Sequence, residues 1–215
     1  GRQTDDRSKT MNLFFDRLGV MKKLLAILVL TLCLTTPSQA DDIRDFQIEG
    51  MSVWGSLLDY FSEEEINKEK WHAYNYNDVF STISFKKSSF ETYDRVQFHY
   101  KLKDKNYKIY GLIGVIVFRD NIKDCFNKKD EIVSELSEVL KDTKKTTNDN
   151  GKHDADKSGK SKTHDVYFSF KSGNYISVSC YDWSEEMTKK NKWFDNLKVA
   201  IQTKEFEDFL IEYYK

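Results

Sequence analysis

The chain has 215 residues, and its 34 lysines and arginines nearly balance its 35 aspartates and glutamates, so its net charge is −1 at pH 7. Such a balance gives no electrostatic reason to expect nucleic acid or an anionic membrane as a partner. The length is sufficient for one domain with a well-buried core.

The N-terminal part of the chain predicts export. The charged tripeptide MKK at 21–23 leads into the apolar run 24–35, and small residues stand at Ser38 and Ala40, the two positions that a signal peptidase reads. The apolar run is about a dozen residues long, whereas a transmembrane helix needs roughly 20. We therefore interpret 21–40 as a cleaved signal peptide rather than as a membrane anchor.

The segment 1–20 opens with the polar, patternless run GRQTDDRSKT and is interpreted as an upstream extension, with translation starting at Met21 or, alternatively, at Met11. The expected mature chain is then 41–215. It is more acidic than the whole chain, because the leader carries more basic than acidic residues. We expect this mature chain to be periplasmic or secreted, with no transmembrane segment left after cleavage.

Two short helices are predicted at the start of the mature chain. The stretch after Gly50 places its apolar residues on one helical face. Ser62 and Glu65 then form a capping box, S-x-x-E, which starts a second helix that ends near Lys70.

Strands follow these helices. The sequence VFSTISF at 79–85 is typical of a strand, and YDRVQFHYKL at 93–102 alternates apolar and polar residues. The segment YKIYGLIGVIVF at 107–118 is apolar on both faces, as expected of a central strand. KDKN at 103–106 is predicted to be a hairpin turn.

A long amphipathic helix is predicted over 120–142, where apolar residues recur at spacings of three and four. No large apolar residue occurs in 143–163, which predicts a flexible polar loop. Two strands at 165–170 and 174–181 are then joined by a hairpin.

The segment NLKVAIQ at 196–202 fits both a strand and a helix, and we favour the strand. Thr203 is expected to cap a C-terminal helix. Together these elements predict a single α+β domain over 41–215. Its antiparallel sheet of about six strands packs against the long central helix and the C-terminal helix, with the two short helices ahead of the sheet.

Two cysteines remain after signal cleavage. Cys125 lies on the apolar stripe of the long helix, and Cys180 is on the inward side of its strand. In an oxidising compartment the two are expected to form a disulfide. The alternatives are two separate buried thiols and, ranked last, a catalytic cysteine, because neither thiol has a basic neighbour that would lower its pKa.

The stretch HDADKSGKSKTHD at 153–165 contains a weak calcium-loop candidate. Asp154, Asp156, Ser158 and Asp165 stand at positions one, three, five and twelve of an EF-hand pattern, with a glycine at position six. Three nearby lysines would repel the ion, and a strand rather than a helix follows. A phosphate loop and a His/Asp transition-metal site are weaker alternatives, and a solvated turn is favoured.

No catalytic or cofactor-binding arrangement is recognised elsewhere in the sequence. His72 and His99 are each interpreted as surface or hydrogen-bonded residues rather than as bases. Several aromatic residues are candidates for the lining of a carbohydrate or peptide groove, although packing is their commoner use. These are Trp71, Tyr74, Tyr76, Trp183 and Trp193.

The run FQIEGMSVWGSLLDYFSEEEI, the DKSGKS turn and the SCYDWS segment together resemble a group of small exported proteins of marine bacteria to which no activity is assigned. This resemblance covers most of the mature chain and implies export. The IEGMS turn followed by a short helix is also similar to small envelope lipoproteins of the outer-membrane assembly type, but this chain lacks their lipid-bearing cysteine after the signal.

Two hypotheses about function remain. The first is a non-enzymatic exported domain that binds another protein or a small ligand in the cell envelope through its sheet or its aromatic residues. The second is a periplasmic enzyme, such as a hydrolase, whose site is assembled from residues distant in sequence. The first hypothesis is favoured, because the core is well patterned and no catalytic arrangement is recognised.

Overall fold

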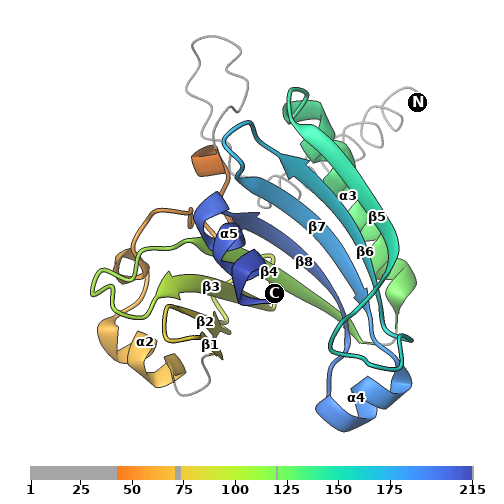
Figure 1. Cartoon of the computed structure of the whole chain (residues 1–215), viewed down its shortest axis with the longest axis horizontal. Coiled ribbons are helices and arrows are strands. Elements are labelled where there is room, and N and C mark those ends of the chain that lie inside the picture. Colours follow the sequence, from red (N-terminus) through yellow and green to blue (C-terminus); the bar gives the residue numbers. More distant parts are fainter. Residues whose placement is uncertain (1–42, 71–73, 120, 215) are drawn as a thin grey trace, which may run out of the picture.

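The computed structural model describes residues 43–70, 74–119 and 121–214 (Figure 1). The predicted signal peptide at 21–40 and the predicted extension at 1–20 lie outside these residues. Within the described residues, no helix is both long and apolar enough to cross a membrane.

The centre of the fold is one antiparallel sheet of eight strands, in the order β1-β2-β3-β4-β8-β7-β6-β5 (Figure 1). Every neighbouring pair is antiparallel. The strands are β1 (Tyr74–Tyr76), β2 (Phe80–Phe85), β3 (Arg95–Lys101), β4 (Gly111–Arg119), β5 (Lys144–Lys152), β6 (Lys162–Ser169), β7 (Tyr175–Asp182) and β8 (Asp195–Gln202).

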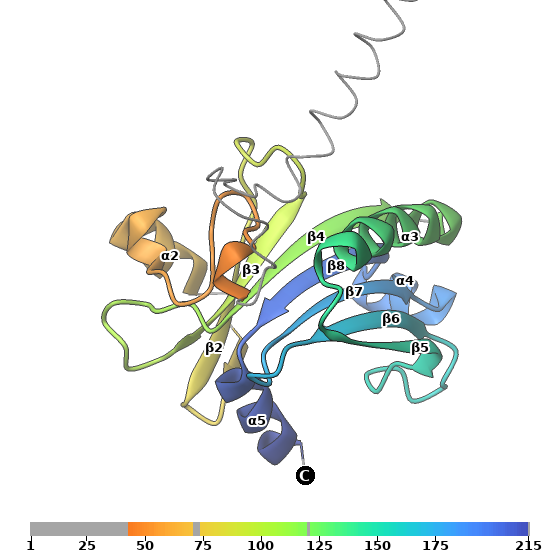
Figure 2. The same cartoon turned by 90° about the horizontal axis from the view of Figure 1, so that it is seen from above.

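Helices lie on both faces of this sheet. The first face carries the main core and is covered by the N-terminal segment and by α3, whereas α5 lies on the opposite, second face (Figure 2). The helical elements are η2 (Ile43–Asp45), η3 (Leu57–Asp59), α2 (Glu63–Glu69), α3 (Ile122–Val139), α4 (Glu185–Asn191) and α5 (Lys204–Tyr213).

Alternation along the strands creates the two faces, because successive side chains of a strand point to opposite sides of the sheet. On β3, Val96 and Phe98 are fully buried in the core of the first face. His99 on the same strand stacks on Phe206 of α5. The predicted strand at 196–202 is confirmed as β8, whose Leu197 lies in the main core.

The predictions for the short and long helices have mixed outcomes. Helix α2 begins where the capping box predicts: the Ser62 and Glu65 side chains each accept a hydrogen bond from the other's backbone N–H. The helix expected just after Gly50 is wrong, since this stretch makes turns and only the 3-10 helix η3. The long helix is confirmed as α3, but it and α5 cover opposite faces of the sheet.

The expected number of about six strands is too small, because β1 and β5 are added at the two ends of the sheet. The predicted polar loop at 143–163 is wrong over Lys144–Lys152, which is strand β5. Nearly all side chains of β5 are exposed, so the segment has no apolar alternation. It is held by backbone pairing with β6 instead.

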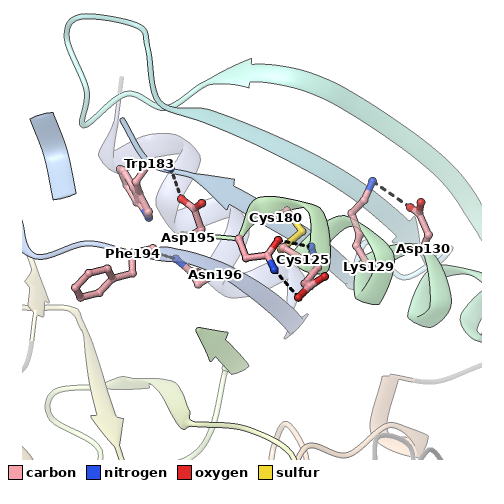
Figure 3. The surroundings of a disulfide bond; sticks show 10 residues. Cys125, Lys129, Asp130, Cys180, Trp183, Phe194, Asp195 and Asn196 are labelled. Atoms are coloured by element: carbon pink, nitrogen blue, oxygen red, sulfur yellow. Dashed lines mark hydrogen bonds and ion pairs between the residues drawn. A yellow bond between two sulfur atoms is a disulfide. The ribbon is translucent and has the colours of Figure 1, made fainter. Parts of the chain in front are cut away.

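The expected disulfide is present and joins α3 to β7. The Cα atoms of Cys125 and Cys180 are 6.0 Å apart, and both residues are fully buried (Figure 3). The bond spans 55 residues of sequence and fixes the helix on the first face of the sheet.

Removal of the disulfide is expected to destabilise the protein strongly. The chain-entropy model assigns about 4 kcal/mol to a closed loop of this size. We expect Cys125→Ser alone to lower the free energy of unfolding, measured by urea denaturation, by nearly as much as the double change with Cys180→Ser. Two free thiols in protein that is denatured without reductant would contradict the bond.

Candidate functional site

The second face of the sheet carries an open cleft of about 590 Å3 beside α5. Strands β3, β4 and β8 form its floor, with Gln97, Ile113, Val115 and Lys198 among the floor residues. Trp183, Trp193 and Phe194 line it beyond the ends of β7 and α4, and Tyr76 and Tyr214 line it from β1 and the end of α5.

The register of the sheet explains how the floor is assembled. Val115 of β4 pairs with Arg95 of β3 on one side and with Lys198 of β8 on the other. Lys198 in turn pairs with Ser179 of β7. Paired residues share a face in an antiparallel sheet, so these side chains form one row across the floor. Four strands, β3, β4, β8 and β7, therefore contribute to this row.

An apolar patch occupies the middle of the floor. Ile113, Val115 and Ala200 pack together as a small buried cluster on the second face, separate from the main core. Ile113 and Val115 of this cluster line the cleft but are only 8% and 5% exposed, so most of the contact area for the body of a ligand is offered by the more exposed aromatic residues.

The aromatic wall of the cleft is held by the chain beyond β7. The backbone N–H of Trp183 donates a hydrogen bond to Oδ1 of Asp195 at 2.9 Å (Figure 3). The ring of Trp183 lies 4.6 Å from that of Trp193, which is 39% exposed. Helix α4 ends with Lys192 in the left-handed conformation. This turn directs the chain from α4 into Trp193 and then into β8.

Lys198 is the charged residue at the centre of the floor. Its side chain is half-buried, and Nζ lies 4.1 Å from the centroid of the Tyr181 ring. Burial lowers the pKa of Lys198 to about 8. Among the described residues, no carboxylate lies close enough to form an ion pair with it.

His153 lies against the aromatic wall. Its ring is 4.4 Å from that of Trp183, and Nδ1 accepts a hydrogen bond from the Ala155 N–H at 3.1 Å. Burial, and then the charge of Lys198, lower the pKa of His153. The imidazole is therefore biased toward its neutral form, with Nδ1 already engaged.

His99 is buried at the α5 side of the cleft rather than exposed on its strand. Its Nδ1 lies 2.6 Å from Oγ1 of Thr82, and its ring stacks on Phe206 at 4.1 Å. Gly111 makes room for this ring, because a Cβ there would lie 2.4 Å from the His99 side chain. Burial, and then Lys198, lower the pKa of His99 to about 3. The expectation of a hydrogen-bonded histidine is confirmed.

The charged side chains that line the cleft share one sign. Arg95, Lys192 and Lys198 are basic, and no Asp or Glu occurs among the described lining residues. The whole chain has a net charge of −1. The cleft therefore differs in electrostatic character from the protein as a whole.

The carboxylates of the calcium-loop candidate do not point to one shared position. Asp156 is buried, and its two carboxylate oxygens accept hydrogen bonds from the hydroxyl and backbone groups of Ser158 and Ser161 and from the Ser184 hydroxyl. These bonds hold the pKa of Asp156 well below its usual range. Asp154 is exposed, and Asp165 lies on β6, where it accepts from Thr163 at 2.9 Å.

The segment is a turn, as favoured, but it is not fully solvated. The buried Asp156 connects it to the N-terminus of α4 through a hydrogen bond from Ser184. The residues of the predicted transition-metal alternative do not come together at one site either. His164 and Asp165 are neighbours on a strand and point to opposite faces, and the His164 ring contacts Phe126 of α3. Within the described residues, no group of three His, Cys, Asp or Glu side chains is placed to hold a metal ion.

The structure brings three of the aromatic candidates, Tyr76, Trp183 and Trp193, to the cleft. Trp71 and His72, like the side chain of Tyr74, lie outside what the structure describes. Sequence reasoning missed Lys198 and His153 as cleft residues. The available signal was a lysine on the polar side of the otherwise apolar strand at 196–202.

No protein-family model, curated protein or solved structure that we compared with this chain matches it. The function of the cleft is therefore argued from its residues.

The Asp156 turn gives a direct test of the calcium alternative. We expect Asp156→Ala to lower the melting temperature, because three serines lose their acceptor. The matched change Asp154→Ala, at an exposed carboxylate in the same turn, should leave it unchanged. Millimolar calcium should not shift the melting temperature of the unmodified protein. A calcium-dependent rise that both variants lose would favour the calcium loop.

His99 makes stability depend on pH in the acid range. The folded pKa is about 3, whereas a histidine in an unfolded chain has a pKa near 6.5. The stability contributed by the neutral ring is therefore complete above about pH 6.5 and is lost progressively as the pH falls toward 3.

We expect the urea midpoint to fall between pH 7 and pH 4.5, and to fall less in His99→Gln. His153 acts in the same direction in both proteins, so the difference between them isolates His99. Equal pH dependence in the two proteins would show that His99 titrates normally in the fold.

Proposed function

We propose that this protein is an exported, non-enzymatic binding domain that takes a small ligand in the cleft of its second face. The observation that carries the proposal is the pairing of an apolar floor with an exposed aromatic wall. Ile113 and Val115 lie in the floor, and Trp183 and Trp193 lie in the wall. Ligand sites are commonly concave and mostly apolar, with a few polar groups that set orientation.

Export rests on two supports. The first is the signal-like sequence at 21–40 together with the resemblance to small exported proteins. The second is the buried disulfide between Cys125 and Cys180, since such bonds persist mainly in oxidising compartments. The periplasm or the cell exterior is the location that agrees with both.

A role in binding agrees with the state of the polar groups around the cleft. His99 is already engaged with Thr82 and covered by Phe206. Nδ1 of His153 is engaged with the backbone of its own turn. Both rings are held by contacts of the fold, and so they shape the walls of a binding site.

The test uses the neutral planar dye N-phenyl-1-naphthylamine, whose fluorescence rises in an apolar site. We expect saturable binding to the oxidised protein and a loss of about tenfold or more in affinity on Trp193→Ala, because a large aromatic contact is removed. Trp54→Phe is the matched control, since Trp54 packs against the core of the first face.

Equal affinity in the two variants would place the dye elsewhere and reject the cleft as the binding site. Incubation with ester, amide and glycoside reporter substrates tests the hydrolase alternative. Turnover that is lost together with a change at a cleft residue would overturn the non-enzymatic part of the proposal.

A further inference from the structure

Lys198, at the centre of the cleft floor, is a cation without a counter-ion among the residues that the structure describes. It is half-buried between β4 and β7, and its Nζ lies 4.1 Å from the centroid of the Tyr181 ring. It forms no hydrogen bond or ion pair with another described residue. A partly desolvated ammonium group that lacks such partners destabilises the fold.

The acidic groups around the cleft are engaged elsewhere. Asp165 lies two strands from Lys198 in the same row and accepts from Thr163 and from Asn148. Asp195 accepts from the backbone of Trp183. The other charged groups that line the cleft, Arg95 and Lys192, carry the same charge as Lys198.

We propose that the ligand of the cleft is an organic acid, with its acid group bound by Lys198 and its planar or apolar body held against Trp183 and Trp193. This inference rests on the proposed function of the cleft and names the class of its ligand. A carboxylate, sulfate or phosphate group would supply the counter-charge that Lys198 lacks. Charge-assisted hydrogen bonds to such groups are stronger than neutral ones.

The geometry matches an acid with a body rather than a free inorganic ion. Lys198 pairs across the sheet with Val115, which belongs to the apolar patch of the floor. The aromatic wall supplies a second apolar surface, with the rings of Trp183 and Trp193 4.6 Å apart. A ligand that reaches Lys198 is therefore bordered by apolar surface on the floor and on the wall.

Two dyes that differ by one sulfonate group test the inference. 8-Anilinonaphthalene-1-sulfonate carries the acid group, and N-phenyl-1-naphthylamine lacks it. We expect the sulfonate to bind the unmodified protein about tenfold more tightly, as one charge-assisted contact would provide. Lys198→Met keeps the apolar stem and should remove this preference, so that the two dyes bind the variant with similar affinity.

Two control variants accompany this change. Lys198→Arg keeps the charge and should keep the preference for the sulfonate. Lys189→Met removes an exposed lysine of α4 that pairs with Glu185 outside the cleft lining, and it should leave both affinities unchanged. Lys198→Met should also unfold at a higher temperature than the unmodified protein, because a half-buried charge has been removed.

The outcomes separate the two proposals. Binding of the neutral dye in the cleft without any preference for the sulfonate would overturn the organic-acid inference and leave the binding function intact. Failure of both dyes to bind in the cleft would reject the binding function itself. Competition by benzoate, phenyl sulfate and phenyl phosphate identifies the acid group, and displacement of the sulfonate by none of them would overturn the inference.

The affinity for the sulfonate should also fall as the pH rises from 7 to 9.5. Lys198 in the free protein loses its proton near pH 8, whereas the sulfonate stays ionised. The other groups that face it are His99 and Arg95 on β3, His153 beyond β5, Tyr181 on β7, Asp165 on β6 and Lys192 after α4. Both histidines are neutral in this range, and Tyr181 has a pKa raised to about 12. A preference that does not fall by pH 9.5 and is also kept in Lys198→Met would exclude Lys198 as the contact.

Discussion

The pairing of β4 with β8 is the interaction on which the rest of the fold depends. It joins residues 111–119 to residues 195–202 and so connects the first four strands to the last four. Without this pairing the chain would hold two separate four-stranded antiparallel sheets. The strands of this central pair are mostly buried, as the middle of a sheet requires.

The two faces of this pair carry different chemistry. On the first face, Leu112 and Leu197 lie in the main core that α3 covers. On the second face, Val115 and Lys198 are opposite each other in the floor of the cleft. The same hydrogen-bonded register therefore sets both the packing that stabilises the domain and the distance between the apolar patch and the charge in the cleft.

Much of the core could be predicted from the sequence. Strand β3 has a clear period of two, and α3 has a clear helical stripe, because the apolar side chains of each element lie on one side of it. The disulfide was predictable because Cys125 and Cys180 are the two cysteines left after the expected cleavage, one on the apolar stripe of its helix and the other on the inward side of its strand. Strand β5 was not predictable in this way, since exposure on both faces leaves no periodic signal and its support comes from β6.

The cleft was less accessible to sequence reasoning than the core. Trp183 and Trp193 were recognised as aromatic candidates, but their grouping with Lys198 depends on where α4 turns back into β8. The position of Arg95 beside Val115 likewise follows from the register between β3 and β4. Such contacts depend on pairings between distant segments, and the local sequence does not specify them.

Strand β5 is an edge strand of the sheet, so the backbone groups on its outer side are not paired with any of the other seven described strands. A long free edge of this kind can nucleate the association of one molecule with the next. Three lysines, Lys144, Lys145 and Lys152, place like charges along this edge. An irregularity between Asn148 and Gly151 further interrupts the register. The polarity that deprives this strand of an apolar period thus also opposes the addition of a second molecule along its edge.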